Sequence, residues 1–306
     1  MKIQTIYLLV GLPGSGKSTY AKLLCKKQTI VYSSDKIRKE ITGDVNNQLF
    51  NMKVFDILKK RTIESLLNGN SVIIDSTNLS YKRRKNFIES LNKIECNKIA
   101  IVMATPFNEC IKRDSERERS VGKNVLDRMY KSFSMPSKME GFDKIDIAYA
   151  DCEYNNYKAS DMIDKVIFLK NINQCNSNHS LTIGSHCEKT WENLLGTDCD
   201  MRICYAGLLH DIGKQYTMSF QNFKGEYSNQ AHFYRHENVS TYEAMFYLKG
   251  NGFDINSIIY ICNLIQYHMR PHLLTTEKSI NKLKRFLGED FYNDLMLLHE
   301  ADKNAR

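Results

Sequence analysis

The stretch GLPGSGKS, residues 11–18, follows the apolar run TIYLLV at residues 5–10. It fits the pattern GxxxxGK[ST], which forms a phosphate-binding loop, or P-loop, when a strand precedes it and a helix follows. Backbone N–H groups of such a loop turn toward a phosphate, and the helix N-terminus adds its positive dipole. We therefore expect Lys17 to reach the β- and γ-phosphates of a nucleotide and the Ser18 hydroxyl to bind Mg²⁺. The predicted nucleotide-binding residues are Gly11, Pro13, Gly14, Ser15, Gly16, Lys17, Ser18 and Thr19.

Around this loop, short apolar runs alternate with helical patterns. The expected strands are TIYLLVG, TIVYSS, SVIIDST and KIAIVMAT, and a helical pattern runs through LFNMKVFDILKKRTIESLL. The alternation predicts an α/β domain over residues 1–150, with a parallel sheet and helices on both faces. Residues 151–180 are polar and Asn/Ser-rich, which predicts a linker, with one stray strand at KVIFL. Residues 181–306 predict an all-α domain.

The bulk composition is that of two globular domains in one chain of 306 residues. Nine cysteines without a CxxC pair favour a reduced, cytoplasmic protein, and the first apolar run is too short to cross a membrane. Residues 1–150 hold 27 Lys and Arg against 16 Asp and Glu, and the remainder holds 16 against 19. The net charges of +11 and −3 indicate either a polyanion-binding first half or a lysine-rich composition without such a site.

The stretch VYSSDKIRKE places Asp35 directly after a predicted strand and Arg38 three residues later. A carboxylate at the C-terminal end of a parallel strand faces the crevice in which α/β sheets bind ligands. Asp35 could accept a proton from an attacking hydroxyl there, and Arg38 could hold an acceptor phosphate. A helix N-cap aspartate followed by a solvated arginine explains the same spacing.

Two further stretches extend this candidate site. In VIIDSTNLSYKRR, Asp75 ends a buried strand, where it could support Mg²⁺. Thr77 and Asn78 could line an acceptor groove, and Arg83 and Arg84 follow on a predicted helix, where simple solvation accounts for either arginine alone. In CIKRDSERERSVGK, Arg113 and Arg117 are about one helical turn apart and could form a lid over the transferring phosphoryl group. An exposed helix of mixed charge is the alternative.

The motifs GLPGSGKS, SSDKIR, IIDSTNLSYKRR and RDSER, in this order, resemble the polynucleotide 5′-kinase branch of P-loop phosphotransferases over residues 1–150. The resemblance implies that ATP and Mg²⁺ bind through Lys17 and Ser18. It also implies that Asp35 is the general base, that Arg38 grips the acceptor and that Arg113 and Arg117 clamp the donor. Small-molecule and toxin-type kinases share much of the pattern, so the acceptor stays open.

The second half contains a different kind of motif, LLHDIGK, in which His210 and Asp211 end an apolar run. Imidazole and carboxylate ligands suit Mn, Fe, Co or Ni, and Asp211 is placed to bridge two ions. Lys214, about one turn further on, could hold a substrate phosphate. Other candidate ligands in this half are His186, His236, His268 and Asp302.

Together with GSHCEKTW and HENVSTYEA, this motif resembles the HD phosphohydrolase superfamily over residues 180–306. The resemblance implies a first metal held by His186, His210, Asp211 and Asp302, and a second metal to which His236 and His268 contribute. The histidines expected to be solvated or structural are His179, His232, His272 and His299.

The two halves together predict RNA end healing. A kinase would phosphorylate 5′-hydroxyl ends, and the phosphohydrolase would remove 2′,3′-cyclic, 2′- or 3′-phosphates, leaving RNA or DNA ends for a downstream ligase. A small-molecule or nucleotide kinase fused to a nucleotide hydrolase, in a signalling or toxin role, is the alternative. A non-catalytic RNA-binding role of the second half fits its negative charge poorly. The sequence does not define the oligomeric state.

Overall fold

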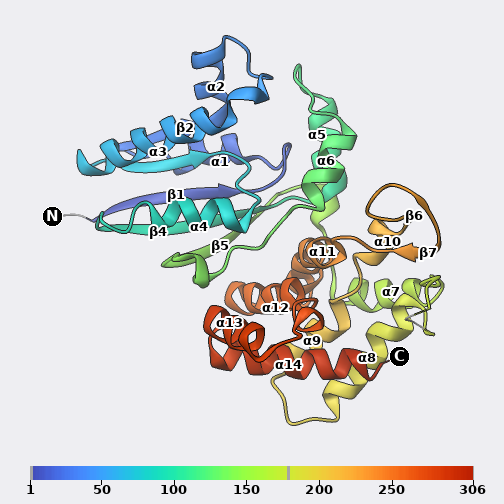
Figure 1. Ribbon diagram of the computed structural model, residues 1–306. Coiled ribbons are helices and arrows are strands. Elements are labelled where there is room, and N and C mark those ends of the chain that lie inside the picture. The colour runs from blue at the N-terminus through green and yellow to red at the C-terminus, as the bar shows by residue number, and fades with distance from the viewer. Residues whose placement is uncertain (1–2, 178–179, 306) are drawn as a thin grey trace. The chain divides into compact units, whose positions relative to one another are not determined.

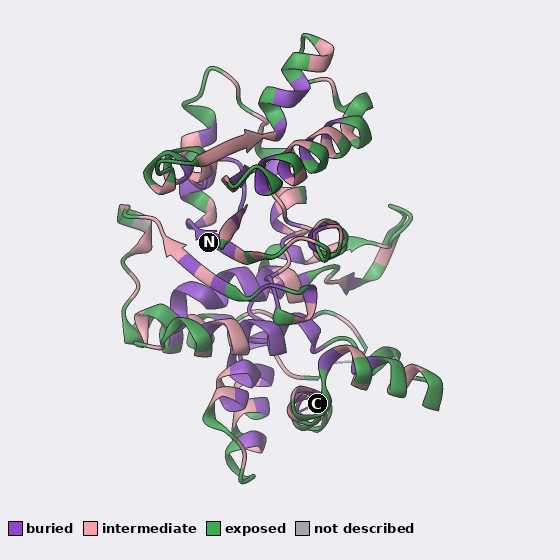
Figure 2. Cartoon of the chain, turned by 90° about the vertical axis from the view of Figure 1, so that its left-hand side faces the viewer, coloured by how far each residue is buried: buried purple, intermediate pink, exposed green. Residues whose placement is uncertain are grey.

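The computed structural model describes residues 3–177 and 180–305, and the chain divides into two compact units. The first consists of Met1–Met129 and Pro136–Asn155. The second consists of Tyr130–Met135 and Asn156–Arg306. Buried positions are concentrated on the central strands of the first unit and on helices of the second unit (Figure 2).

The first unit is built on one parallel sheet in the order β2-β3-β1-β4-β5 (Figure 1). Its strands are β1 (Gln4–Val10), β2 (Thr29–Ser33), β3 (Ser71–Asp75), β4 (Cys96–Ala104) and β5 (Lys144–Tyr149). The four strands expected from the sequence are present, and the parallel α/β fold is confirmed. The sequence prediction missed β5, because its alternation of apolar and charged residues, KIDIAY, lacks a continuous apolar run.

Helices flank this sheet (Figure 1). They are α1 (Lys17–Leu24), α2 (Ser34–Thr42), α3 (Asn51–Leu67), α4 (Tyr81–Glu89), α5 (Phe107–Ser115) and α6 (Lys123–Tyr130). The strands β1, β2 and β3 are parallel, so their C-terminal ends meet at the same edge. The P-loop, Asp35 and Asp75 follow or end these strands and are therefore brought together.

The second unit is mainly helical. Its helices are α7 (Ala159–Leu169), α8 (Ile183–Leu195), α9 (Met201–Leu209), α10 (Lys214–Thr217), α11 (His236–Gly250), α12 (Ile255–Tyr267), α13 (Glu277–Leu287) and α14 (Glu289–Lys303). Helices α11 and α12 form much of its core. A short antiparallel hairpin, β6 (Ser219–Gln221) and β7 (Tyr227–His232), adds strands to the half expected to be all-α.

The stray strand expected at KVIFL is wrong, because this stretch lies in α7. The buried residues Met162, Val166 and Leu169 recur at helical spacing, which outweighs the local preference of Val and Ile for strands. Helix α8 packs closely on this helix at Gly184, where a Cβ atom would lie 2.3 Å from the Val166 carbonyl oxygen. Within the described part of the chain, every helix is too short or too polar to cross a membrane.

Two candidate active sites

The P-loop is a main-chain cradle between β1 and α1. Gly14 has a φ of +84°, and a Cβ atom at this position would lie 2.5 Å from the backbone oxygen of Cys110. Both the left-handed backbone and the close approach require glycine. The Lys17 Nζ atom donates to the carbonyl oxygens of Gly11 at 3.0 Å and Leu12 at 2.6 Å. Burial lowers the pKa of Lys17 to about 8, although Asp75 opposes the shift.

The two residues expected near Mg²⁺ lie in direct contact. The Ser18 hydroxyl at the start of α1 donates a hydrogen bond of 2.7 Å to Oδ2 of Asp75 at the end of β3. A serine hydroxyl beside a strand-terminal carboxylate is an oxygen-rich pair that suits Mg²⁺. This arrangement fits the predicted cation.

Asp35 lies in the first turn of α2 between two guanidinium groups. Arg38 donates to Oδ1 at 2.6 Å, and Arg119 donates to Oδ2 at 3.1 Å. The Arg38 side chain is almost fully buried and also donates to Asn51 Oδ1. Arg119 was not among the predicted site residues. Its position in the arginine-rich stretch RDSERERS was the available signal, but the contact with Asp35 spans 84 residues of sequence.

The cradle opens on one side into a cavity of about 290 Å³. Five basic residues and two carboxylates line it, a balance that suits phosphate groups. Phe55 also lines it, with the guanidinium of Arg83 5.9 Å from the centre of its ring. The charged lining residues are Lys17, Asp35, Arg38, Asp75, Arg83, Arg117 and Arg119, and Thr77 from the predicted groove is also among the lining residues.

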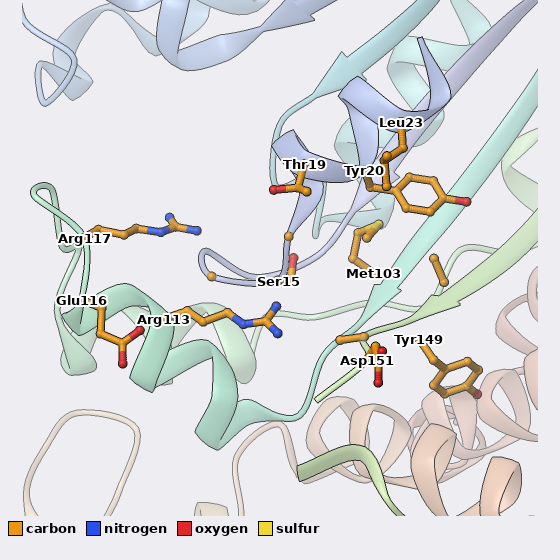
Figure 3. Close-up of a pocket in the computed structure, with 14 residues that line it drawn as sticks. Ser15, Thr19, Tyr20, Leu23, Met103, Arg113, Glu116, Arg117, Tyr149 and Asp151 are labelled. Carbon is orange, nitrogen blue, oxygen red and sulfur yellow. The ribbon is translucent and has the colours of Figure 1, made fainter. Parts of the chain in front are cut away.

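A second cavity of about 730 Å³ also borders the loop. Gly14, Gly16 and Thr19 of the P-loop stretch line it. The side chains of Arg113 and Arg117 point toward the loop from the segment that carries α5 (Figure 3). The predicted lid arginines therefore lie beside the loop, and Arg117 borders both cavities.

Arg84 and Asn78 are not among the residues that line the cavity of about 290 Å³. The Arg84 guanidinium is fully buried and pairs with Glu140 at 2.7 Å, while its Nη1 donates to the Asn78 and Leu79 carbonyl oxygens. The Asn78 side chain donates to the Leu9 carbonyl oxygen at 2.8 Å. Both residues hold the loop after β3 in place. Only Arg83 of the arginine pair lines the cavity, because adjacent helical residues point about 100° apart.

The second candidate site gathers four histidines whose ring orientations are fixed in the same way. Each Nδ1 atom faces a backbone carbonyl oxygen at 2.6–3.0 Å. A carbonyl only accepts, so each Nδ1 carries a proton, and a neutral ring then presents a lone pair at Nε2. The four residues are His186, His210, His236 and His268.

The Nε2 atoms meet in two pairs. Those of His186 and His210 are 3.2 Å apart, and those of His236 and His268 are also 3.2 Å apart. Two lone pairs at this distance repel each other unless a proton or a cation lies between them. Histidines oriented by backbone carbonyls with Nε2 directed inward are typical of metal ligands. The residues present therefore fit divalent metals.

Asp211 lies between the two pairs. Its Oδ2 is 3.3 Å from His210, and its Oδ1 is 3.1 Å from His236. Among the residues that the structure describes, this buried Oδ1 has no hydrogen-bond partner. Asp302 closes the first pair, with Oδ1 2.9 Å from Nε2 of His186. The structure thus brings together all six predicted ligands, from α8, the α9–α10 region, α11, the end of α12 and α14.

The charges in this centre are strongly coupled. Burial lowers the pKa of His210, but Asp211 and Asp302 raise it more, to about 10. Burial favours the neutral form of Asp211, but His210 and Lys214 hold the pKa of this carboxyl well below its usual range. Burial and the charge of His210 lower the pKa of His268. The two histidines therefore differ: the surroundings favour the protonated form of His210 and the neutral form of His268.

Lys214 is buried and lies at this centre. Its Nζ is 2.6 Å from Asp211 Oδ2 and 2.7 Å from Gln174 Oε1, and it lies 5.3 Å from the centre of the Phe233 ring. The structure thus places this predicted phosphate-binding residue on the carboxylate that lies between the histidine pairs.

The remaining histidines fall in different environments. His232 stacks on Tyr234, and His179 lies outside the described residues. His272 and His299 were expected to be solvated or structural, yet both lie beside Asp302. Nε2 of His272 is 3.3 Å from Asp302 Oδ2.

Comparisons with known protein families match two separate segments of the chain. Residues 6–136 match the family model of an AAA domain, and residues 176–306 match that of an HD domain. The first half is therefore a P-loop domain of kinase type, and the second half is an HD domain.

Several curated proteins are similar to parts of the chain. The L-seryl-tRNA(Sec) kinase of Methanococcus maripaludis is 28% identical over 194 residues, which cover 58% of this chain and 68% of that protein. Transcription factor bHLH140 of Arabidopsis thaliana is 35% identical over 161 residues, 50% of this chain and 17% of that protein. The bifunctional polynucleotide phosphatase/kinase of Schizosaccharomyces pombe is 25% identical over 148 residues. That match covers 47% of this chain and 33% of that protein, so the chain spans a third or less of the last two relatives.

Among solved structures, a chain of the Pnkp1/Rnl/Hen1 RNA repair complex is 24% identical to this chain, with a TM-score of 0.39. The match covers 43% of this chain and 44% of that one.

Proposed function

Because the chain joins a P-loop domain to an HD domain, we propose that it heals the two ends of a broken RNA. The P-loop domain transfers the γ-phosphoryl group of ATP to a 5′-hydroxyl. At the other end, the HD domain uses one water to open a 2′,3′-cyclic phosphate to a 2′- or 3′-phosphate, and a second water to release that group as inorganic phosphate. The products are a 5′-phosphate and ends without the blocking phosphate, which is the arrangement that an RNA ligase joins.

In the kinase half, some side chains act on ATP, the phosphoryl donor, and others act on the 5′-hydroxyl, the phosphoryl acceptor. Lys17 and the main-chain amides of the loop hold the β- and γ-phosphates, and Ser18 with Asp75 holds Mg²⁺. Asp35 accepts the proton of the attacking hydroxyl, while Arg38 and Arg119 orient its carboxylate. Arg113 and Arg117 add positive charge beside the donor.

In the HD half, His186, His210, Asp211 and Asp302 hold a first metal, and His236 and His268 complete a second site with Asp211. When bound, such metals supply a hydroxide near neutral pH and polarise the phosphorus–oxygen bond. Lys214 orients Asp211 and adds a positive charge for an anionic substrate.

The single observation that carries this proposal is that one chain contains both the P-loop site and the histidine–aspartate centre, with the side chains of each site already close together. The four inward-facing Nε2 atoms argue against a purely RNA-binding role for the second half, because RNA binding does not require them. The names of two relatives, a kinase of seryl-tRNA and a polynucleotide phosphatase/kinase, support an acceptor that is part of a nucleic acid. A ligase partner, DNA as a second substrate and a cytoplasmic location belong to the same proposal. The nine free thiols suit a reducing compartment.

A small-molecule kinase remains the second candidate, and one observation favours it. The acceptor cavity of about 290 Å³ is the size of a single nucleotide or metabolite. Arg84 does not line this cavity, because its guanidinium forms a buried ion pair with Glu140.

The decisive experiment offers the purified protein a short RNA with a 5′-hydroxyl and a 2′,3′-cyclic phosphate, together with ATP, Mg²⁺ and Mn²⁺, Co²⁺ or Ni²⁺. Matched DNA, nucleosides and small polyols serve as competing acceptors. We expect both RNA ends to be converted, with Asp35→Asn losing only 5′-phosphorylation. Lys93→Ala, which changes an exposed residue that lines neither cavity, serves as the matched control. Phosphorylation of nucleosides or polyols in preference to RNA would favour the small-molecule kinase.

A further inference from the structure

Asp302 faces imidazoles on both of its oxygens. Its Oδ1 is 2.9 Å from Nε2 of His186 and 3.6 Å from Nε2 of His210. Its Oδ2 lies 3.3 Å from Nε2 of His272, a residue of the short 3₁₀ turn Pro271–Leu273. The ligand set proposed for the HD site uses only the first of these oxygens.

The same two-sided arrangement occurs at Asp211, where Oδ2 is 3.3–3.4 Å from the Nε2 atoms of His186 and His210. Its Oδ1 lies 3.1 Å from Nε2 of His236 and 3.8 Å from that of His268. Each carboxylate therefore presents its two oxygens to different histidine groups. A carboxylate in this position can bridge two cations.

His272 is joined by a second imidazole. His299 lies one helical turn before Asp302 on α14, so both side chains lie on the same face of the helix. The ring centres of His272 and His299 are 4.5 Å apart, compared with 5.1 Å in each of the two inner pairs. One ligand atom each from His272, His299 and Asp302 lies within 4.8 Å of the others.

His299 also carries a polar atom that the protein leaves unsatisfied. Its Nδ1 is buried, and the part of the chain that the structure describes provides it with no hydrogen-bond partner. A buried polar atom without a protein partner is costly, and a bound water or ion would satisfy it. In contrast, the Nδ1 atoms of the four inner histidines all face backbone carbonyl oxygens.

We propose that His272, His299 and the outer oxygen of Asp302 form a third divalent-cation site, linked through this carboxylate to the HD metal centre. Two imidazoles and one carboxylate suit Mn, Fe, Co, Ni or Zn, as at the inner positions. The His272 side chain is 28% exposed, whereas those of the inner four histidines are no more than 7% exposed. Water or a substrate phosphate can therefore complete the outer coordination shell, and this ion binds less tightly than the inner ones.

The competing explanation is that His272 only orients Asp302 by a hydrogen bond. The two roles differ in how many ions the protein binds. Loss of an orienting partner weakens an inner ion by about 10–100-fold without changing the number of sites. Loss of a ligand removes one ion and leaves the inner two in place.

The test counts Co²⁺ bound to the full chain after chelation and reloading, by visible absorbance during titration and by elemental analysis. Excess Mg²⁺ and omission of nucleotide keep Co²⁺ from the P-loop. We expect three ions per chain in the wild type and two in both His272→Ala and His299→Ala, with the two remaining affinities changed by less than about tenfold. His232→Ala removes a histidine outside the cluster and should retain three ions.

Two ions in the wild type, or a 10–100-fold weakening of an inner ion in His272→Ala, would overturn the third site. If His299→Ala fails to fold, as judged from its thermal melting curve, His272→Ala decides alone, because His272 lies in a partly exposed turn. Metal counting needs no RNA, so its outcome is independent of the end-healing activity.

Discussion

The two candidate sites in this chain are constructed in opposite ways. The P-loop site depends on eight consecutive residues, and the main chain supplies its phosphate contacts. The HD centre depends on side chains spread between residues 186 and 302, and six of them are buried together. One site is local and presents backbone amides, whereas the other exists only when five regions of the second unit pack correctly.

The difference predicts how each site responds to substitution. The main-chain cradle survives the loss of a side chain, so a substitution removes one charge and leaves the loop in place. The buried centre is coupled through Asp211, which lies within 3.8 Å of five cationic or imidazole groups. A change at this carboxylate should disturb every ligand at once.

Asp211→Asn is therefore expected to have the largest effect. The amide keeps the shape but removes the charge between the two histidine pairs, so both inner metals bind poorly. We expect end hydrolysis to fall by about 10³-fold or more, corresponding to about 4 kcal/mol of transition-state stabilisation. Steady-state hydrolysis of the cyclic phosphate end measures this loss. Phosphorylation of the 5′ end in the same sample is the control, and its loss would contradict two independent sites.

Lys17→Ala is expected to be nearly as damaging to the other activity. The substitution removes the ammonium group that the proposal places on the β- and γ-phosphates, and one such donor is worth about 10²–10³-fold in rate. The reaction to measure is 5′-phosphorylation at saturating ATP. Unchanged end hydrolysis shows that the protein is folded, and an unchanged kinase rate would remove Lys17 from the site.

The same contrast between contiguous and dispersed residues explains which parts of these sites could be predicted from the sequence. The P-loop could be predicted because its residues are contiguous, and the motif LLHDIGK identified two residues of the HD centre, His210 and Asp211. Arg119 was missed because its partner Asp35 lies 84 residues away and no local pattern links the two. The positions of His272 and His299 beside Asp302 were also inaccessible, since a turn and a helix from different parts of the sequence create that cluster.

Arg84 is the opposite case: its motif suggested a role in substrate binding, but its buried position indicates a role in stabilising the fold. Its buried pair with Glu140 predicts that Arg84→Met destabilises the first unit. Breaking a buried pair costs about 3–5 kcal/mol, and we expect the lower end, about 3 kcal/mol. Burial already raises the pKa of Glu140, so the orphaned carboxyl can take up a proton at modest cost. Urea unfolding monitors the effect, with Arg83→Met as the matched neighbour; equal stability of both variants would contradict a structural role.

The smallest expected effect is a pH dependence at Lys17. Burial lowers its pKa to about 8 in the nucleotide-free protein, whereas bound phosphates favour the ammonium form. ATP binding therefore takes up a proton near pH 8, and the affinity falls as pH rises through this value. Because the charged fraction of Lys17 falls about tenfold between pH 7 and pH 9, the dissociation constant for MgATP should rise by about the same factor.

Titration calorimetry at several pH values measures this constant, and Lys17→Arg is the matched control because arginine stays charged throughout this range. The variant should show a nearly flat profile even if its affinity is lower. A wild-type profile as flat as that of the variant would mean that Lys17 is already fully charged in the empty loop. In that case the Gly11 and Leu12 carbonyl oxygens, which accept hydrogen bonds from its ammonium group, offset the cost of burial before any nucleotide binds.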